Sequence, residues 1–187
     1  MTVEYLSDLR RHPSTRNDSV HAIQVLVRRS ARPELHIAFR FDGDVSRIRV
    51  PSQGVPRIAA QLWRHTCFGA FVAVEGQSAY HEFNFAPSGE WTVYALRGYR
   101  DGGPLANEAM NPHIATRATD TRLELDAVVR LDTLSAIHSR APLRLGLSAV
   151  IEANDGTLSY WALHHPCDKP DFHNPDSFVL RLEPPGL

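Results

Sequence analysis

The chain has few cysteines and no long apolar segment. It contains only Cys67 and Cys167, and its first residues include an early acid, Glu4, without the apolar stretch of an export signal. We therefore expect two free thiols and a cytoplasmic location. No segment approaches the roughly 20 consecutive apolar residues that cross a bilayer, so no membrane is expected as a partner.

An excess of charge of one sign is also lacking. Twenty Lys and Arg residues face 21 Asp and Glu residues, for a net charge of -1, and Lys169 is the only lysine. Nucleic-acid-binding domains usually carry a clustered basic excess. The short basic segment at residues 28–32 is soon followed by Glu34. No nucleic acid is therefore expected as a partner.

Sequence signatures of enzymes are missing as well. The chain has no Gly-x-Ser-x-Gly, no glycine-rich phosphate-binding loop and no His-Glu-x-x-His. A cysteine nucleophile beside a histidine, or Glu82 paired with Asp171 on a glycosidic bond, can be imagined. No spacing in the sequence brings either pair together. No catalytic residue is predicted, and hydrolysis is the third of three functional hypotheses.

What the chain does contain is a strong alternation of apolar and polar residues. Residues 122–131 place aliphatic side chains at odd positions and mostly charged ones at even positions, and residues 143–151 alternate in the same way. A period of two predicts strands with one buried face. The turn sequence Asn-Asp-Gly at residues 154–156 predicts a hairpin over residues 151–160.

This pattern continues along the whole chain and predicts an antiparallel β-sandwich. The predicted strands are residues 20–27, 34–41, 47–50, 67–74, 79–85, 92–97, 122–131, 143–151, 158–163 and 178–182. Helix is scarce: residues 55–64 could form a turn or two, and a short capped helix is expected to begin at Asp132. Many strands without alternating helices favour an all-β fold. With 187 residues, 43% of them hydrophobic, we expect a single domain over residues 1–187.

The first group of candidate site residues precedes a predicted strand. Trp63, Arg64 and His65 lie just before the apolar segment 67–74, which would place them near the rim of the sandwich. In one interpretation Trp63 packs over the open end while its neighbours face solvent. In the other, Trp63 stacks on a sugar ring or a porphyrin and the two basic side chains donate hydrogen bonds.

The second group lies within a predicted strand. Alternation over residues 80–85 puts Tyr80, Glu82 and Asn84 on one face and the phenylalanines on the other. An ordinary solvated face is one interpretation, and a surface that binds hydroxyl groups is the other. The turn that follows brings Trp91 to the same neighbourhood.

The third group is close to the C-terminus. Residues 161–173 contain Trp161, His164, His165 and His173 together with one cysteine and two aspartates. Such a set suggests a metal site. However, no pair has the i, i+4 spacing of a helical zinc site, and two prolines predict an extended loop. The alternative is a proline-stiffened loop that closes the sandwich.

Taken together, these segments resemble the bacterial DOMON-like domain family. The resemblance is carried in fixed order by residues 62–68, 80–89, 91, 94, 145–152, 158–164 and 165–173, and it covers the chain from about Val20 to Leu182. More distantly, the family is similar to the ninth family of carbohydrate-binding modules and to haem-binding DOMON domains. The resemblance implies a β-sandwich with a pocket on one sheet for a sugar or a haem. One departure is Gly69, where relatives usually have Glu.

Two functional hypotheses follow from these residues. The first is a non-catalytic domain that binds a small molecule, a sugar: Trp63, Trp91 or Trp161 would stack on its ring, and polar side chains would bond its hydroxyls. The second is a haem or metal cofactor; Met110 with a histidine is the candidate axial pair for a haem, although neither lies in a recognisable ligand motif. The predicted ligand-binding residues are Trp63, Arg64, His65, Tyr80, Glu82, Asn84, Trp91, Trp161 and His173, and the alternative metal ligands are His164, His165 and His173.

Overall fold

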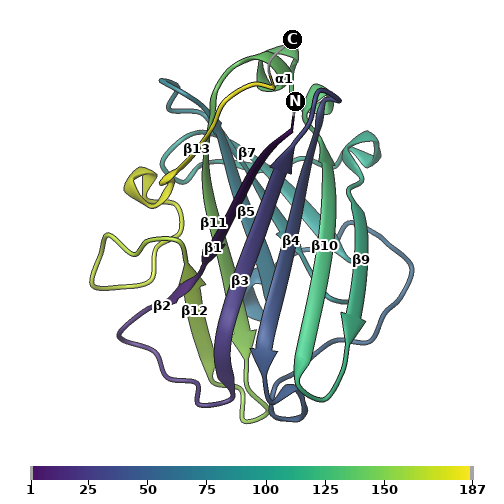
Figure 1. Ribbon diagram of the computed structural model, residues 1–187, viewed down its shortest axis with the longest axis vertical. Helices are drawn as coiled ribbons and strands as arrows, with labels where there is room; N and C mark the ends of the chain where they lie inside the picture. Colours follow the sequence, from purple (N-terminus) through teal and green to yellow (C-terminus); the bar gives the residue numbers. More distant parts are fainter. Residues whose placement is uncertain (1, 186–187) are drawn as a thin grey trace.

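Two antiparallel sheets lie face to face in the computed structural model, which describes residues 2–185 (Figure 1). Sheet A has the strand order β1-β3-β4-β10-β9, and its strands are β1 (Val3–Asp8), β3 (Val20–Arg29), β4 (Glu34–Gly43), β10 (Arg122–Arg130) and β9 (His113–Ala118). Every neighbouring pair in this sheet is antiparallel.

Sheet B has the order β2-β12-β11-β5-β6-β7-β8, and a short strand pairs with one end of β11. Its strands are β2 (Arg10–Arg11), β12 (Leu158–Ala162), β11 (Leu143–Glu152), β5 (Cys67–Val74), β6 (Tyr80–Phe85), β7 (Trp91–Gly98), β8 (Asp101–Pro104) and β13 (Leu180–Leu182). The helices are all short: η1 (Val45–Arg47), η2 (Leu62–Arg64), η3 (Glu108–Met110), η4 (Leu131–Thr133), α1 (Ala136–Arg140) and η5 (Pro175–Ser177). Among the described residues, no helix is long and apolar enough to cross a membrane.

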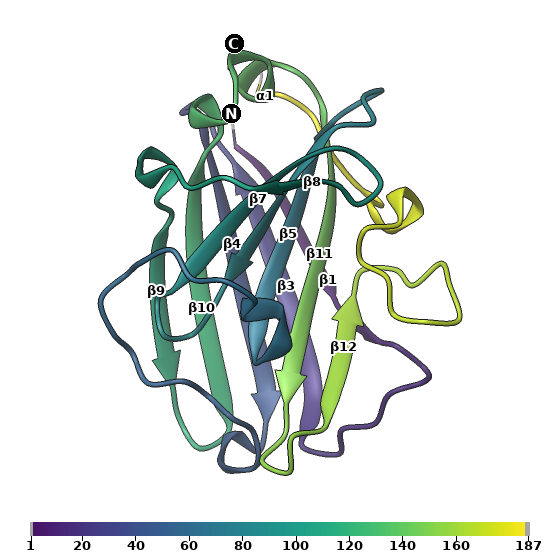
Figure 2. The same cartoon turned by 180° about the vertical axis from the view of Figure 1, so that it is seen from behind.

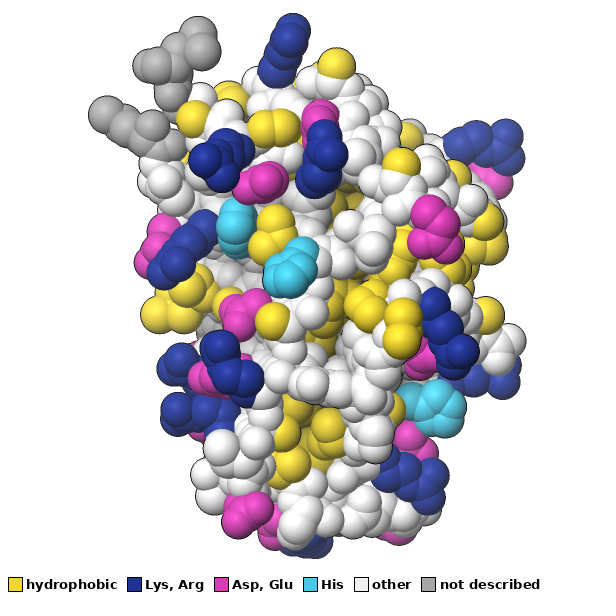
Figure 3. Space-filling model, turned by 90° about the vertical axis from the view of Figure 1, so that its right-hand side faces the viewer, with side chains coloured by type: hydrophobic (Ala, Val, Ile, Leu, Met, Phe, Trp, Pro, Cys, Tyr) yellow, Lys and Arg dark blue, Asp and Glu magenta, His cyan; other side chains and the backbone are white. Residues whose placement is uncertain are grey.

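The core lies between the two sheets, where every second side chain of each strand points inward. The largest fully buried apolar side chains include Trp91, Phe39, Phe41, Phe68, Phe83 and Phe85. Burying one such side chain contributes about 1.5–3 kcal/mol. The fold therefore needs no disulfide, and Cys67 and Cys167 are both free, as predicted. Figure 3 shows the side of the molecule on which β9 lies. Apolar side chains are visible there between regions that carry both basic and acidic side chains.

The predicted antiparallel β-sandwich is confirmed, and the predicted strands form with one exception. Residues 47–50 do not form a strand: η1 ends there, and Ile48 makes only an isolated bridge to Ala153. The predicted hairpin is confirmed, because β11 and β12 pair directly across a turn in which Gly156 has a φ of 87°. A positive φ of this kind is readily adopted by glycine.

Two helix predictions were only partly right. Residues 55–64 contain η2 but are otherwise irregular, because their backbone bonds to another segment: the Ala59 amide donates to the carbonyl of Trp91, and the Trp91 amide donates to that of Arg57. The expected helix at Asp132 is split into η4 and α1.

Two of the predicted ligand-binding residues belong to the core instead. Trp91 is fully buried because its position on β7 alternates with the outward-facing Thr92 and Tyr94. Trp161 faces the interior of β12, packs with the main core and donates its indole hydrogen to Ser159 Oγ at 3.0 Å. Neither ring is therefore placed to stack on a ligand at the outer surface of sheet B.

Candidate ligand-binding face

The outer face of sheet B brings together polar side chains from neighbouring strands. Strand registers place Glu82 of β6 between Phe71 of β5 and Tyr94 of β7. One step along the strands, Asn84 lies between Gly69 and Thr92 in the same way. Because residues two apart on a strand share a face, these side chains all point away from the core.

Glu82 and Asn84 form a buried polar pair at the centre of this face. The Asn84 amide donates from Nδ2 to Glu82 Oε1 at 2.9 Å. Asn84 is only 5% exposed and Glu82 only 7%. Burial raises the pKa of the Glu82 carboxyl, and the bond from Asn84 and the nearby Arg100 offset part of that rise. A carboxylate held in this way is a strong acceptor for hydroxyl donors.

The residues beside Asn84 on the neighbouring strands of this face are small. Across the sheet from Asn84 the registers run through Gly69, Ser148 and Ala162, on β5, β11 and β12. A Cβ atom added to Gly69 would lie 2.5 Å from Ser148 Oγ, which is closer than van der Waals contact allows. A side chain at this position, such as the Glu expected from the sequence resemblance, would therefore require the Ser148 side chain to move. The glycine therefore leaves no side chain between Asn84 and Ser148 on this face.

One wall of the face is the loop that contains His173. The Arg100 amide donates to the Tyr80 hydroxyl at 3.3 Å, and this hydroxyl lies 2.9 Å from His173 Nδ1. Nε2 faces the Glu82 carboxylate, whose Oε2 lies 3.7 Å away, and this acceptor favours the neutral tautomer with its proton on Nε2. Nδ1 then accepts the hydrogen of the Tyr80 hydroxyl. Burial, helped by Arg100, lowers the pKa of His173 to about 4, so this imidazole is neutral at pH 7.

Aromatic packing and an ion pair hold this loop on the sheet. Phe71 projects from β5 into a cluster with Phe178, whose ring centroid is 5.5 Å away, and with Phe172 at 6.4 Å. Asp171 accepts from the Tyr99 hydroxyl at 2.7 Å and from Arg100 Nη2 at 2.8 Å. The wall is therefore a fixed part of the fold.

The other side of the face is formed by η2, which lies over sheet B (Figure 2). Gln61 adopts a left-handed conformation, with a φ of 58°, as the chain enters this turn. Trp63 is 45% exposed, and the Arg64 guanidinium lies 5.2 Å from the centroid of its ring. Burial and Glu82 raise the pKa of Tyr94, partly offset by the Gln61 backbone and the Trp63 side chain. Trp63 is thus an exposed aromatic surface beside the polar floor.

Among the predicted residues, the structure brings Tyr80, Glu82, Asn84 and His173 into one connected group and places Trp63 beside it. Arg64 stacks on Trp63 and extends toward solvent.

His65 lies elsewhere, at one end of the sandwich. Its Nδ1 is 2.8 Å from Glu152 Oε2, and Arg49 Nη1 bonds the other oxygen of this carboxylate at 2.8 Å. These three residues line a cavity of about 500 Å³ together with Ile48, Val50, Pro51, Leu62, Thr66, Ala86, Glu90 and Asn154.

The residues proposed for a metal or a haem do not form such a site. Among residues 2–185, no group of three or more His, Cys, Asp or Glu side chains is arranged to hold a metal ion. His165 bonds the Arg10 carbonyl through Nε2 at 2.8 Å, whereas His173 bonds Tyr80. Met110 is buried in the main core on η3 and cannot serve as an axial ligand at the surface. The residues present therefore do not fit a haem held by methionine.

Several residues of the face were not among the predicted site residues. Tyr94 and Ser148 could have been found by extending the alternation along β7 and β11, since each lies two residues from another outward-facing position. Arg100 and Asp171 join the site through loops, where no periodicity signals a contact. Asp171 had been considered as a partner of Glu82 in hydrolysis, but its carboxylate bonds Tyr99 and Arg100 instead.

Comparison with solved structures shows what this fold is similar to. A candidate carbohydrate-binding protein from Bacteroides uniformis superposes with a TM-score of 0.66 at 13% identity, over 92% of this chain and 83% of that one. A family 9 carbohydrate-binding module from Caldicellulosiruptor kristjanssonii in complex with cellotriose gives 0.61 at 8% identity, over 98% and 83%. The glucose complex of a family 9 module from the same organism gives 0.53 at 7% identity, over 94% and 83%.

At these low identities the likeness shows a shared fold. No protein-family model matches the sequence, and no curated protein matches it. The chain therefore shares its β-sandwich fold with these carbohydrate-binding proteins.

Proposed function

We propose that this protein is a non-catalytic carbohydrate-binding domain whose ligand lies on the outer face of sheet B. The observation that carries the proposal is the buried pair of Glu82 and Asn84 beside the exposed ring of Trp63. The ring would stack on the apolar face of a sugar, while the carboxylate and the amide bond its hydroxyls. The neutral His173, with its proton on Nε2, supplies a further donor.

The fold comparisons support the ligand class. The family 9 modules that share the sandwich bind cellotriose and glucose in their structures. The finer relationship to DOMON-like domains rests on the sequence motifs described above. We keep two further expectations as part of the proposal: a single domain over residues 1–187 and a cytoplasmic location.

A titration with cellotriose and glucose, followed by a wider panel of soluble glycans, tests this function. Trp63 is the one tryptophan of the three that is strongly exposed, so its fluorescence should report binding. Trp63→Ala should abolish the fluorescence change and weaken binding measured by calorimetry about five- to tenfold, because stacking on an aromatic ring is worth about 1–1.5 kcal/mol.

Val55→Ala is the control, since Val55 is 82% exposed on the neighbouring loop and should bind like the wild type. Absence of heat and fluorescence change across the whole panel would overturn the proposal. Unchanged affinity in Trp63→Ala would move the site away from this face.

A further inference from the structure

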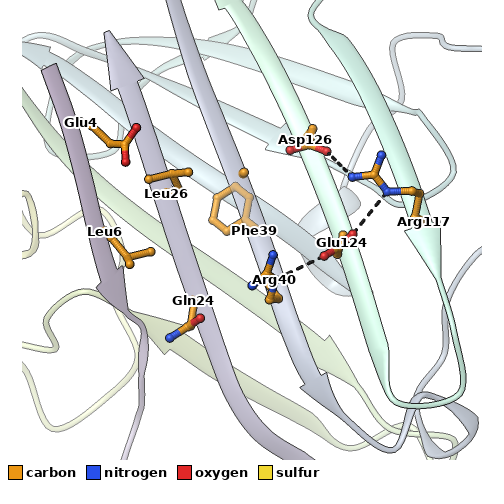
Figure 4. Close-up of a pocket in the computed structure, with 10 residues that line it drawn as sticks. Glu4, Leu6, Gln24, Leu26, Phe39, Arg40, Arg117, Glu124 and Asp126 are labelled. Atoms are coloured by element: carbon orange, nitrogen blue, oxygen red, sulfur yellow. Dashed lines mark hydrogen bonds and ion pairs between the residues drawn. The ribbon is translucent and has the colours of Figure 1, made fainter. Parts of the chain in front are cut away.

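The outer face of sheet A carries a groove that runs across the strands (Figure 4). Strand registers place Leu6, Leu26 and Ala38 side by side on β1, β3 and β4, and the row continues through Asp126 of β10. Leu6 is 64% exposed although it is aliphatic. The row forms an apolar floor at right angles to the strands.

Longer polar side chains rise on both sides of this floor. One flanking row contains Asp8, Gln24, Arg40, Glu124 and Arg117, and the other contains Glu4, Arg28 and His36. Between them lies a cavity of about 300 Å³. A smaller hollow of about 90 Å³ adjoins it and shares Leu26, Ala38 and Asp126.

The charges along the groove neutralise one another. Arg40 Nε lies 3.3 Å from Glu124 Oε1, and Arg117 lies 3.3 Å from the same carboxylate and 3.4 Å from Asp126. Arg28 also pairs with Glu4 at 2.6 Å, so three cations balance three anions among the residues that line the two hollows. Such a wall offers many hydrogen-bonding atoms with no net charge. It therefore suits a neutral ligand rich in hydroxyl groups better than a cation or an anion.

The direction and length of the groove indicate an elongated ligand. Five strands spaced about 4.8 Å apart make the sheet roughly 19 Å wide from its first strand to its last. We propose that sheet A carries a second carbohydrate site, for an extended neutral oligosaccharide that lies across the strands. Its apolar ring faces would rest on Leu6 and Leu26, and its hydroxyls would bond Gln24, Arg40 and Glu124. The choice of a carbohydrate as the ligand rests on the function proposed for sheet B. The existence of the groove does not depend on that function.

A second copy of this chain fits the groove less well. The apolar floor is a single row whose aliphatic part on β1, β3 and β4 consists of Leu6, Leu26 and Ala38. Interfaces between identical subunits have a broader apolar core. With sugar sites on opposite faces, one domain could instead bridge two glycan chains, which raises the overall affinity for a multivalent surface.

Chemical-shift mapping with cellohexaose tests the second site. Amide signals of the ¹⁵N-labelled protein should shift in two separate groups, one around Leu26 on sheet A and one around Glu82 on sheet B. Leu26→Glu should weaken the sheet A site about tenfold or more, because it places a carboxylate against the apolar face of the sugar. The sheet B site should keep its affinity.

Ile137→Glu is the matched control, since it adds the same charge at an exposed aliphatic residue on α1 and should change neither site. Arg40→Ala removes one hydrogen-bonding group of the wall and tests the site independently if Leu26→Glu disturbs folding. It should weaken the sheet A site several-fold.

The other possible results of the chemical-shift mapping distinguish the two sites. Shifts on sheet B alone would overturn the second site and leave the proposed function standing. Shifts on sheet A alone would support the groove and overturn the site on sheet B. No shifts on either sheet would overturn both. A doubled mass by light scattering without sugar, lost in Leu26→Glu, would assign the groove to a second copy of the chain.

Discussion

The two outer faces of the sandwich are built on the same backbone pattern but differ in what lies over them. On sheet A the outward-facing side chains form open rows, and ion pairs such as Arg40 with Glu124 lie in solvent. On sheet B, η2 and the loop around His173 lie over the strands, so that Phe71 and Glu82 are buried although they point away from the core. The segments that cover sheet B, and not its strands, therefore account for the buried polar side chains on its outer face.

The largest expected difference between the faces is in stability. Phe71→Ala should lower the free energy of unfolding by about 3–5 kcal/mol, because it empties the centre of a buried aromatic cluster. Leu26→Ala, on the open face, should cost less than about 1 kcal/mol, since a half-exposed side chain leaves no closed cavity. Urea denaturation monitored by circular dichroism measures both. Equal losses would mean that the loop around His173 does not pack on sheet B in solution.

The next effect is on the pH dependence of stability. Burial lowers the pKa of His173 and of His138 to about 4, against 6.5 for an unperturbed imidazole. Between these values the unfolded chain binds more protons than the folded one, so stability falls as the pH falls from 6.5 to 4. Each histidine should contribute roughly 2–3 kcal/mol to that loss.

His173→Gln and His138→Gln should each make the decline shallower, and the double variant should combine both effects. The measurement is the free energy of unfolding at several pH values between 4 and 7. Because His138 lies on α1 and His173 lies on the loop over the sheet B face, a change confined to one variant would identify which region titrates. Parallel curves for all four proteins would contradict the prediction.

Glu82 should show opposite effects on binding and on stability. Its raised pKa means that burial penalises the ionised form, so Glu82→Gln should raise the free energy of unfolding at pH 7. The same change removes a charged acceptor, and the affinity for cellotriose should fall about tenfold. Glu90→Gln is the matched control. Glu90 lies outside the candidate face, and its Oε1 pairs with Arg57 Nη2 at a distance of 2.6 Å. Unchanged binding in Glu82→Gln would exclude this carboxylate from the site.

The sequence predicted the sandwich well because alternation is a local signal. The regular strand over residues 122–131 and the Asn-Asp-Gly hairpin need no knowledge of the partner strands. β8 was missed because its sequence, Asp-Gly-Gly-Pro, has low strand propensity and is held only by pairing with β7. β1 was missed although it alternates, since Leu6 occupies a solvent-facing position and blurs the pattern.

The candidate site was predictable only in part, for the same reason. Alternation on one strand assigned Tyr80, Glu82 and Asn84 to a common face, and the structure places them there. It could not tell that Trp91 faces the core, because a tryptophan at the start of a strand suits either face. The contact between His173 and Tyr80 joins residues 93 positions apart through a loop, and only tertiary packing determines it.

The smallest expected effect concerns the ion pairs of sheet A. Arg117→Ala removes both the contact with Glu124 and that with Asp126, yet it should lower the free energy of unfolding by less than about 1 kcal/mol, because exposed pairs gain little over solvation in water. The difference should shrink further in 0.5 M salt, where screening weakens exposed pairs. Thermal unfolding at low and high salt measures it. A loss as large as that of Phe71→Ala would mean that the two faces are equally buried in solution, with a partner covering sheet A.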